Sequence, residues 1–149
     1  MKELLKKRAD WFEKKTIDLG FDLFTNSYEV VPEEVLLEVM SYGLPTRARH
    51  WGYGQSYEYQ KHQGEMGNSK VYELIINCDP AISFILESNS DIANTLVLAH
   101  VQGHNYFFKH NYLFKGTDRK MVYHAAERAQ RIDEYIHQHG IEKVERMMD

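Results

Sequence analysis

The chain has 149 residues, of which 43% are hydrophobic and 27% are charged, as is typical of a soluble globular protein. Its net charge of -4 and its lack of a basic run give no support for a nucleic-acid partner. A single cysteine, Cys78, excludes an internal disulfide, and no apolar stretch is long enough for a membrane span or a secretory signal. We therefore expect one domain over residues 1–149, located in the cytoplasm.

The N-terminal part of the chain predicts two helices separated by strand-forming segments. Residues 2–19 have the apolar periodicity of an amphipathic helix. Residues 21–31 are rich in aromatic and β-branched side chains, with a turn expected at residues 25–27. Pro32 opens a second helix, which we expect to end at Gly43.

Residues 43–67 form an irregular segment that is dense in functional groups. The candidate substrate-binding and acid–base side chains of this segment are Arg47, Arg49, His50, Trp51, Tyr53 and Glu58. Loop residues of this kind often carry function when a rigid scaffold positions them. A helix is expected to begin near Gln55. The alternative to a functional role is a surface loop fixed by Trp51.

A buried strand is predicted over residues 70–78, because apolar groups point to both of its faces. Glu73 interrupts this strand, and a buried carboxylate there must be paired, hydrogen-bonded or bound to a metal. Exposure at a sheet edge is the alternative. Cys78 is expected to be a small core residue rather than a nucleophile. The Asp-Pro pair at residues 79–80 then predicts the start of a helix that extends through Leu86.

The next helix is expected from Ile92 to Phe108, with Ser90 or Asp91 as its cap. Its middle, LVLAHV, is apolar on nearly every side. A surface helix keeps one polar face, so this pattern predicts a buried helix.

His100 and His104 lie four residues apart in this helix, so their imidazoles leave the same face one turn apart. Such a pair is a common half-site for zinc or iron. Gly103 between them predicts a close approach by another backbone or a ligand. The alternative is two core histidines, each hydrogen-bonded to a neighbouring group. The protease motif HExxH is absent, because Val101 follows His100.

The C-terminal part predicts two further helices. A cap at residues 117–118 begins one that extends to about His139, and residues 141–149 form a short last helix. His124 and Glu127 have the spacing of a half-site, but the helical phase favours a solvated face for both. The order of elements predicts a mainly helical α+β domain with a small β-sheet and a central buried helix that carries the two histidines.

Several segments of the chain are similar, in the right order, to the stage V sporulation protein R family, usually named SpoVR-like. The histidine helix reads AHVQGHNYFFKHN and resembles the family's AHVxGHxxFFxxN segment. The segments SYGLPTRARHWGYGQSYE, YELIINCDPAISFILESNS, LFKGTDRKM and HGIEKVE agree as well. Because the similarity covers nearly all 149 residues, the chain is identified as a SpoVR-like protein, either a short member or the N-terminal part of a longer one.

The resemblance implies a bacterial or archaeal cytoplasmic protein that is associated with spore cortex formation in spore formers. It also implies a protein partner, which is either the C-terminal region of longer members or a serine protein kinase system that accompanies the family. No reaction is attached to the family, so the candidate site residues rest on side-chain chemistry.

The first functional hypothesis is a domain that binds a divalent metal and could hydrolyse a substrate. His100, His104 and Glu73 would hold zinc or another divalent metal, and a water would occupy the open position.

Other side chains would act around this metal. Glu58 or Glu127 would be the general base, and His50 or Arg49 would stabilise an anionic substrate or transition state. Gln102 would orient a substrate or the imidazoles.

The second hypothesis is a non-catalytic structural or protein-interaction module with buried structural histidines. In this case the aromatic loop and the last helix would bind a partner through exposed apolar surface. The residues leave open whether the protein is an enzyme.

Overall fold

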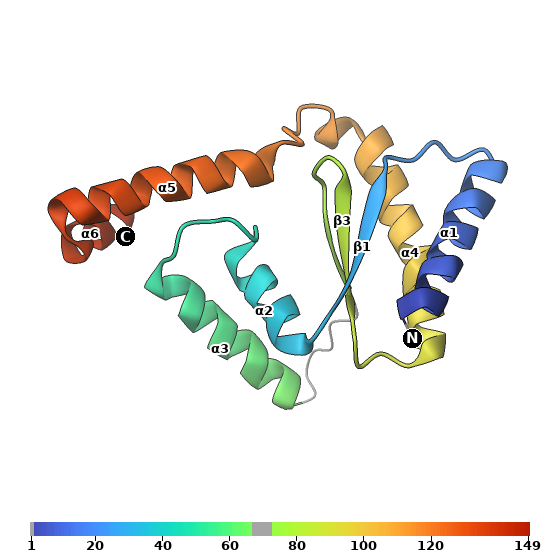
Figure 1. Cartoon of the computed structure of the whole chain (residues 1–149), viewed down its shortest axis with the longest axis horizontal. Helices are drawn as coiled ribbons and strands as arrows, with labels where there is room; N and C mark the ends of the chain where they lie inside the picture. The colour runs from blue at the N-terminus through green and yellow to red at the C-terminus, as the bar shows by residue number, and fades with distance from the viewer. Residues whose placement is uncertain (1, 67–72) are drawn as a thin grey trace. The chain divides into compact units, whose positions relative to one another are not determined.

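The computed structural model describes residues 2–66 and 73–149, and within them the chain is mainly helical with one small sheet, as expected (Figure 1). The elements are α1 (Lys2–Asp18), β1 (Asn26–Val31), α2 (Glu33–Tyr42), α3 (Trp51–Glu65), β2 (Glu73–Ile76), β3 (Ala81–Leu86), α4 (Asp91–His110), the 3-10 helix η1 (Tyr112–Phe114), α5 (Met121–His139) and α6 (Ile141–Met148). The α+β class is confirmed.

The chain divides into two compact units. Unit 1 consists of Met1–Leu36 and Lys70–Arg119, and unit 2 consists of Leu37–Ser69 and Lys120–Asp149. Unit 1 contains the sheet with α1 and α4, whereas unit 2 contains α3, α5 and α6. The expectation of a single domain over the whole chain stays a prediction.

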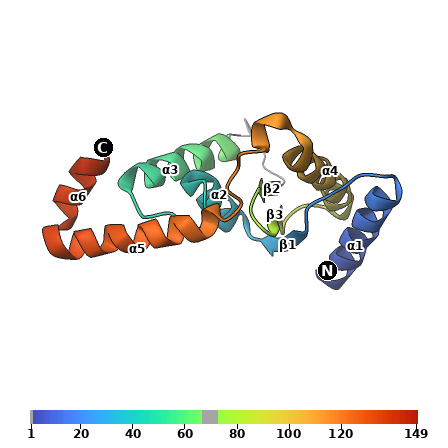
Figure 2. The same ribbon diagram turned by 90° about the horizontal axis from the view of Figure 1, so that it is seen from above.

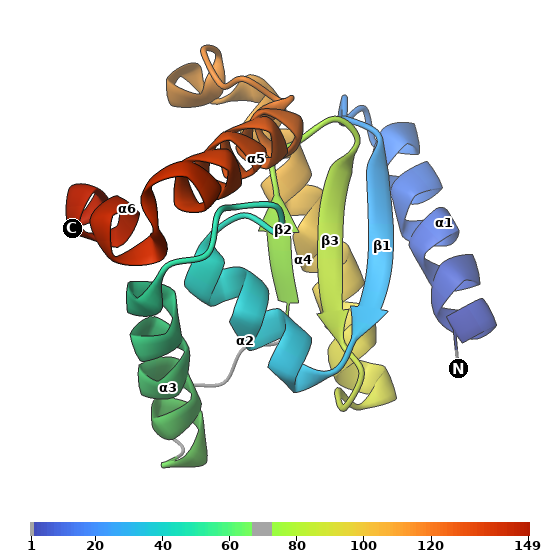
Figure 3. The ribbon, with the colours of Figure 1, turned by 60° about the vertical axis from the view of Figure 1, so that its left-hand side comes forward.

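The sheet of unit 1 has the strand order β1-β3-β2, with β3 parallel to β1 and antiparallel to β2 (Figure 3). Its central strand, β3, has hydrogen-bonded neighbours on both sides, so its apolar sequence AISFIL is suited to burial. Ala81, Ser83 and Ile85 alternate along the strand and are each 0% exposed, so one face of β3 is fully covered.

The prediction of a helix over residues 79–86 is wrong, because Ala81–Leu86 is β3. A short apolar run is compatible with a helix or a central strand, and periodicity alone does not separate them. Pairing with β1 and β2 satisfies the backbone of this segment on both sides.

The core of unit 1 lies between one face of the sheet and the helices α1 and α4, which stand on the same side of it (Figure 2). The buried cluster consists of Leu5, Ala9, Ile85, Val97, Leu98 and Val101. Each residue of α4 in this cluster comes from one stripe of the helix, because side chains three and four positions apart share a face.

Asn105 of α4 connects the helix to the segment between α1 and β1. Its side-chain carbonyl accepts a hydrogen bond from the Phe24 N–H, and its amide donates one to the Phe24 C=O, both at 2.8 Å. The residue is 1% exposed, so these bonds satisfy a buried amide and also fix where the chain enters β1.

Helix α4 is not buried on nearly every side, contrary to the expectation from its apolar sequence. Ile92 is 76% exposed and Leu96 is 67% exposed, while Leu98 and Val101 are fully buried. Among the described residues the helix covers one sheet face and contacts α1, so only the stripe that faces them is removed from water.

Several element boundaries also differ from the predictions. Residues 26–27 lie within β1 instead of in a turn, and α3 begins at Trp51 rather than near Gln55. The cap of α5 is Lys120 rather than residues 117–118. Thr117 instead donates its backbone N–H to the C=O of Phe114, which continues the turn that follows η1.

Candidate metal centre

Glu73 is placed by the register of the sheet. It is the first residue of β2 and lies directly opposite Ile85 of β3. Opposed residues of an antiparallel pair project their side chains from the same face of a sheet. Ile85 belongs to the core beneath α4, so Glu73 also projects toward α4, and its side chain is 17% exposed. Of the two alternatives for this carboxylate, pairing is the one observed.

His100 and His104 project from α4 above this edge of the sheet. Ser90 caps the helix by accepting a hydrogen bond from the Ala93 N–H, and the helix runs unbroken past both histidines. Their rings are nearly perpendicular, with centroids 4.5 Å apart. The spacing of four residues therefore places both imidazoles on one face, as the sequence predicted.

The two histidines are not buried, which corrects the expectation that they lie on a buried face. The side chain of His100 is 62% exposed, and His104 is half-buried. Leu98 and Val101, which are fully buried, are turned by about 200° and 100° around the helix from His100, so His100 lies at the border of the core-facing stripe. The alternative of two buried structural histidines is therefore wrong for His100.

Gly103 does not mark a close approach of another group. A Cβ built on this residue meets no atom within 4 Å, so the described residues leave open space there. The glycine is exposed, and the packing gives no reason for it.

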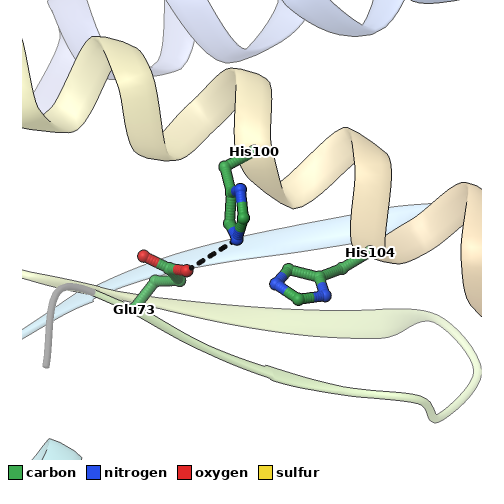
Figure 4. A group of neighbouring side chains, drawn as sticks. All are labelled: Glu73, His100 and His104. Atoms are coloured by element: carbon green, nitrogen blue, oxygen red, sulfur yellow. Dashed lines mark ion pairs between the residues drawn. The ribbon is translucent and has the colours of Figure 1, made fainter.

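Glu73, His100 and His104 meet at one point (Figure 4). One potential ligand atom from each residue lies within 4.8 Å of the other two, and His100 Nε2 is 3.5 Å from Glu73 Oε1. Ligand atoms about 2.1 Å from a tetrahedral metal are roughly 3.4 Å apart, so the pair already has the spacing of two ligands.

The electrostatics of this group favour the neutral form of the His104 imidazole. Burial lowers the pKa of His104 below its ordinary value, and the neighbouring His100 acts in the same direction, while Glu73 opposes the shift. Histidine binds metals in its neutral form, so less proton release is needed at His104.

An open depression of about 660 Å³ lies beside the three residues. Glu73 and His100 form part of its wall, and the rest is formed by Ala93, Leu96, Val97 and Ala99. Sequence reasoning missed this apolar surface, although Leu96 and His100 are four residues apart and so share a face of the helix. The candidate ligands are therefore next to space that could hold part of a bound molecule.

Gln102 does not lie with the histidines, although the sequence suggested that it could orient them. It is 4% exposed, and its side-chain amide donates a hydrogen bond to the Tyr28 hydroxyl of β1. Two residues along a helix turn the side chain by about 200°, which places Gln102 on the sheet-facing side. Gln102 therefore connects α4 to β1 through its hydrogen bond with Tyr28.

We expect Tyr28 to titrate late in the folded protein. Burial raises the pKa of its phenol above the ordinary value, and the charges of Glu13 and Asp10 add to the shift, while hydrogen bonds with Asn26 and Gln102 oppose it. Because the unfolded chain releases this proton near pH 10, the stability contributed by Tyr28 is present below that pH and is lost as the pH rises further.

An alkaline titration followed by tyrosinate absorbance measures this effect. Tyr28→Phe should remove from the absorbance titration curve a component whose midpoint lies above about pH 10. Tyr112→Phe, which removes a tyrosine that is 79% exposed, should leave that component in place. A Tyr28→Phe difference curve centred at or below the ordinary tyrosine pKa would contradict the prediction.

The other predicted site residues all belong to unit 2. These residues are Arg47, Arg49, His50, Trp51, Tyr53, Glu58 and Glu127. None of them is a member of the Glu73, His100 and His104 cluster. Their assigned roles in catalysis or substrate binding stay predictions.

Within unit 2, His50 has a structural role at the start of α3. Its Nδ1 accepts a hydrogen bond from the Gly52 N–H and so caps the helix, and its Nε2 lies 3.1 Å from Asp149 Oδ1. The Trp51 indole N–H donates to the same carboxylate oxygen at 3.0 Å. Both ring nitrogens of His50 therefore already have partners, and no motif in the sequence indicated them.

The remaining predicted groups of unit 2 are at the surface. Arg47 donates to the Tyr42 C=O at 3.3 Å and lies 4.9 Å from the centre of the Tyr53 ring. Glu58 is exposed, and Glu127 lies 3.2 Å from the His124 imidazole. The expected proximity of His124 and Glu127 is observed, on the solvated side of α5.

The fold and this site define a mainly helical α+β protein with a two-histidine, one-glutamate cluster on the edge of a mixed sheet. The family model described as SpoVR like protein matches residues 1–149, and the chain belongs to the SpoVR-like family. It is 34% identical to the uncharacterized protein YcgB of Escherichia coli strain K12 over 86% of this chain and 26% of that protein. The chain thus spans about a quarter of the length of this relative.

No solved structure matches the chain. Among residues 2–66 and 73–149, no helix has the length and apolar character needed to cross a membrane.

Proposed function

We propose that unit 1 binds a divalent metal ion through Glu73, His100 and His104. The observation that carries this proposal is the convergence of one ligand atom from each residue within 4.8 Å, on elements far apart in the sequence. The exposure of His100 supports it, because a metal ion can reach the group directly from solvent.

The ligand set favours zinc or ferrous iron. Two imidazoles and one carboxylate occur in catalytic zinc sites and in the iron sites of oxygenases, and both kinds keep open coordination positions. A water at such a position is acidified by the metal and becomes a nucleophile near neutral pH. Hydrolysis is therefore the reaction class that we propose for the site when a substrate is present.

The binding function has more support than the hydrolytic one. The proposed general bases, Glu58 and Glu127, belong to unit 2, and in the described part of unit 1 the cluster contains no carboxylate other than Glu73. From the family resemblance we also propose that, in a spore-forming organism, the metal site contributes to spore cortex formation. Complementing a deletion strain with a chain that lacks His100 and His104 would test that role.

Elemental analysis of the purified protein tests the metal proposal. We expect close to one zinc or iron per chain in the wild type, and less than about a tenth of this amount in a His100→Ala, His104→Ala double variant, because two of three ligands are gone. His110→Ala is the matched control, since His110 lies on the same helix and bonds to the Asp22 C=O outside the cluster.

Two outcomes would contradict the metal proposal. One is a protein that takes up no divalent metal after purification and incubation with zinc or ferrous iron. The other is a metal content that the double variant and the His110→Ala control retain equally. Circular dichroism of all three proteins checks that they have the same helical content, so that a loss of metal is not caused by a loss of fold.

A non-catalytic interaction module is the second candidate function. The observation that favours it is a group of exposed apolar side chains around η1, where Tyr112 is 79% and Leu113 is 83% exposed. Its partner would be the C-terminal region of longer family members or the serine kinase system, both of which the resemblance implies. A metal-free protein that binds such a partner through η1, and loses it on Leu113→Asp, would support this function over metal binding.

A further inference from the structure

The geometry points to a specific class of ligand for this site: a monoanion that binds the metal through oxygen and carries an uncharged, apolar tail. The tail would lie in the depression beside the metal ligands. This inference rests on the proposed metal-binding function. The ligand would occupy the open coordination positions of the bound metal.

The charge of the loaded site selects the head group. A divalent cation bound by one carboxylate and two neutral imidazoles leaves a net charge of +1. Among the described residues that line the depression, Glu73 and His100 are the ones with ionisable side chains, and both belong to the proposed ligand set. A singly charged oxygen donor therefore neutralises the site without leaving an unpaired charge.

The walls of the depression select the tail. Apart from the two proposed ligands, the lining residues within the described part of the chain are Ala93, Leu96, Val97 and Ala99, all of them apolar. Val97 is 5% exposed and belongs to the core, whereas Leu96 is 67% exposed and so has much apolar surface left to cover. The volume of about 660 Å³ is within the range of small-molecule sites.

The two parts of the ligand are connected by the geometry of α4. His100 follows Leu96 by one helical turn, so a tail attached to a metal-bound head group can run along the helix toward Leu96 and Ala93. Of the residues that the structure describes, none but the metal ligands themselves would offer a polar or charged tail a hydrogen-bonding side chain there. The depression therefore discriminates against hydrophilic tails.

Alkyl hydroxamates of increasing length provide the test, because they bind divalent metals as monoanions and differ only in the tail. We would measure their affinity for the zinc-loaded protein by calorimetry, from acetohydroxamate to octanohydroxamate. We expect the affinity to rise about twofold per methylene. This increase corresponds to roughly half of the free energy that full burial of a methylene would give, because the depression is open.

Two variants assign the effect to the depression. Leu96→Ser should remove most of the dependence on chain length, because it deletes the largest exposed apolar wall. Leu113→Ser is the matched control, since Leu113 is also exposed but lies in η1, and it should leave the dependence unchanged.

The possible failures of the test are distinguishable. A protein that binds zinc and acetohydroxamate, but shows the same affinity for all chain lengths, overturns the apolar-tail inference and leaves the metal site in place. A chain-length dependence that Leu96→Ser does not reduce overturns it as well, because the tail then lies elsewhere. A protein that binds no zinc overturns both the inference and the proposed function.

Discussion

Replacing His104 by alanine is expected to lower the affinity of unit 1 for zinc by roughly 100- to 1,000-fold. Structural zinc sites with four ligands have apparent binding free energies of about 10–16 kcal/mol, or about 2.5–4 kcal/mol for each ligand. Burial lowers the pKa of His104, which favours its neutral form, so alanine removes an imidazole that needs little proton release and lies close to the other ligand atoms. Glu73→Gln should also weaken binding, since an amide oxygen is a poorer ligand than a carboxylate.

Competition with a chromophoric zinc chelator measures these affinities at fixed pH. His110→Ala should bind zinc as the wild type does, because this residue lies outside the cluster. An affinity unchanged by His104→Ala would remove His104 from the ligand set. A loss of equal size in the His110→Ala control would mean that zinc binds nonspecifically to exposed histidines.

Replacing Leu98 by alanine is expected to destabilise unit 1 by about 3 kcal/mol. Leu98 is 0% exposed and packs in the cluster formed by α1, α4 and β3, so its truncation loses buried apolar surface and leaves a cavity. The nearby Leu96→Ala removes the same atoms from a side chain that is 67% exposed and should change stability by less than about 0.5 kcal/mol.

Urea unfolding of the metal-free proteins, followed by circular dichroism, compares the two leucines. Because both variants have the same chemical change on the same helix, the difference between them reports burial rather than helix propensity. A cost for Leu96→Ala as large as that for Leu98→Ala would mean that Leu96 is covered in solution. The depression beside the metal ligands would then be filled by protein.

Much of the fold follows from local sequence signals. Gly20 and Gly43 end their helices with positive φ, and Ser90 caps α4, as their residue types predict. The mainly helical class is determined in the same way, by apolar periodicity over long segments. The family was also evident from the sequence, through motifs that extend along nearly the whole chain.

The strand β3 could not be predicted from its own residues. The sequence AISFIL has no polar alternation and follows an Asp-Pro pair, which is also a common helix start. Its conformation is decided by β1 and β2, which lie on either side of it and are separated from each other by more than forty residues. Local propensity is weak against such pairing.

The candidate metal centre shows the same division between sequence and tertiary structure. The four-residue spacing of His100 and His104 is enough to place both on one face of a helix, because the helical repeat fixes this relation whatever surrounds it. The sequence did not determine which face of α4 is buried, since the apolar residues surround the helix and only the sheet and α1 select the covered side. Nor did it determine where Glu73 points. The register that sets Glu73 opposite Ile85 directs its carboxylate to the histidines, and register depends on the partner strand.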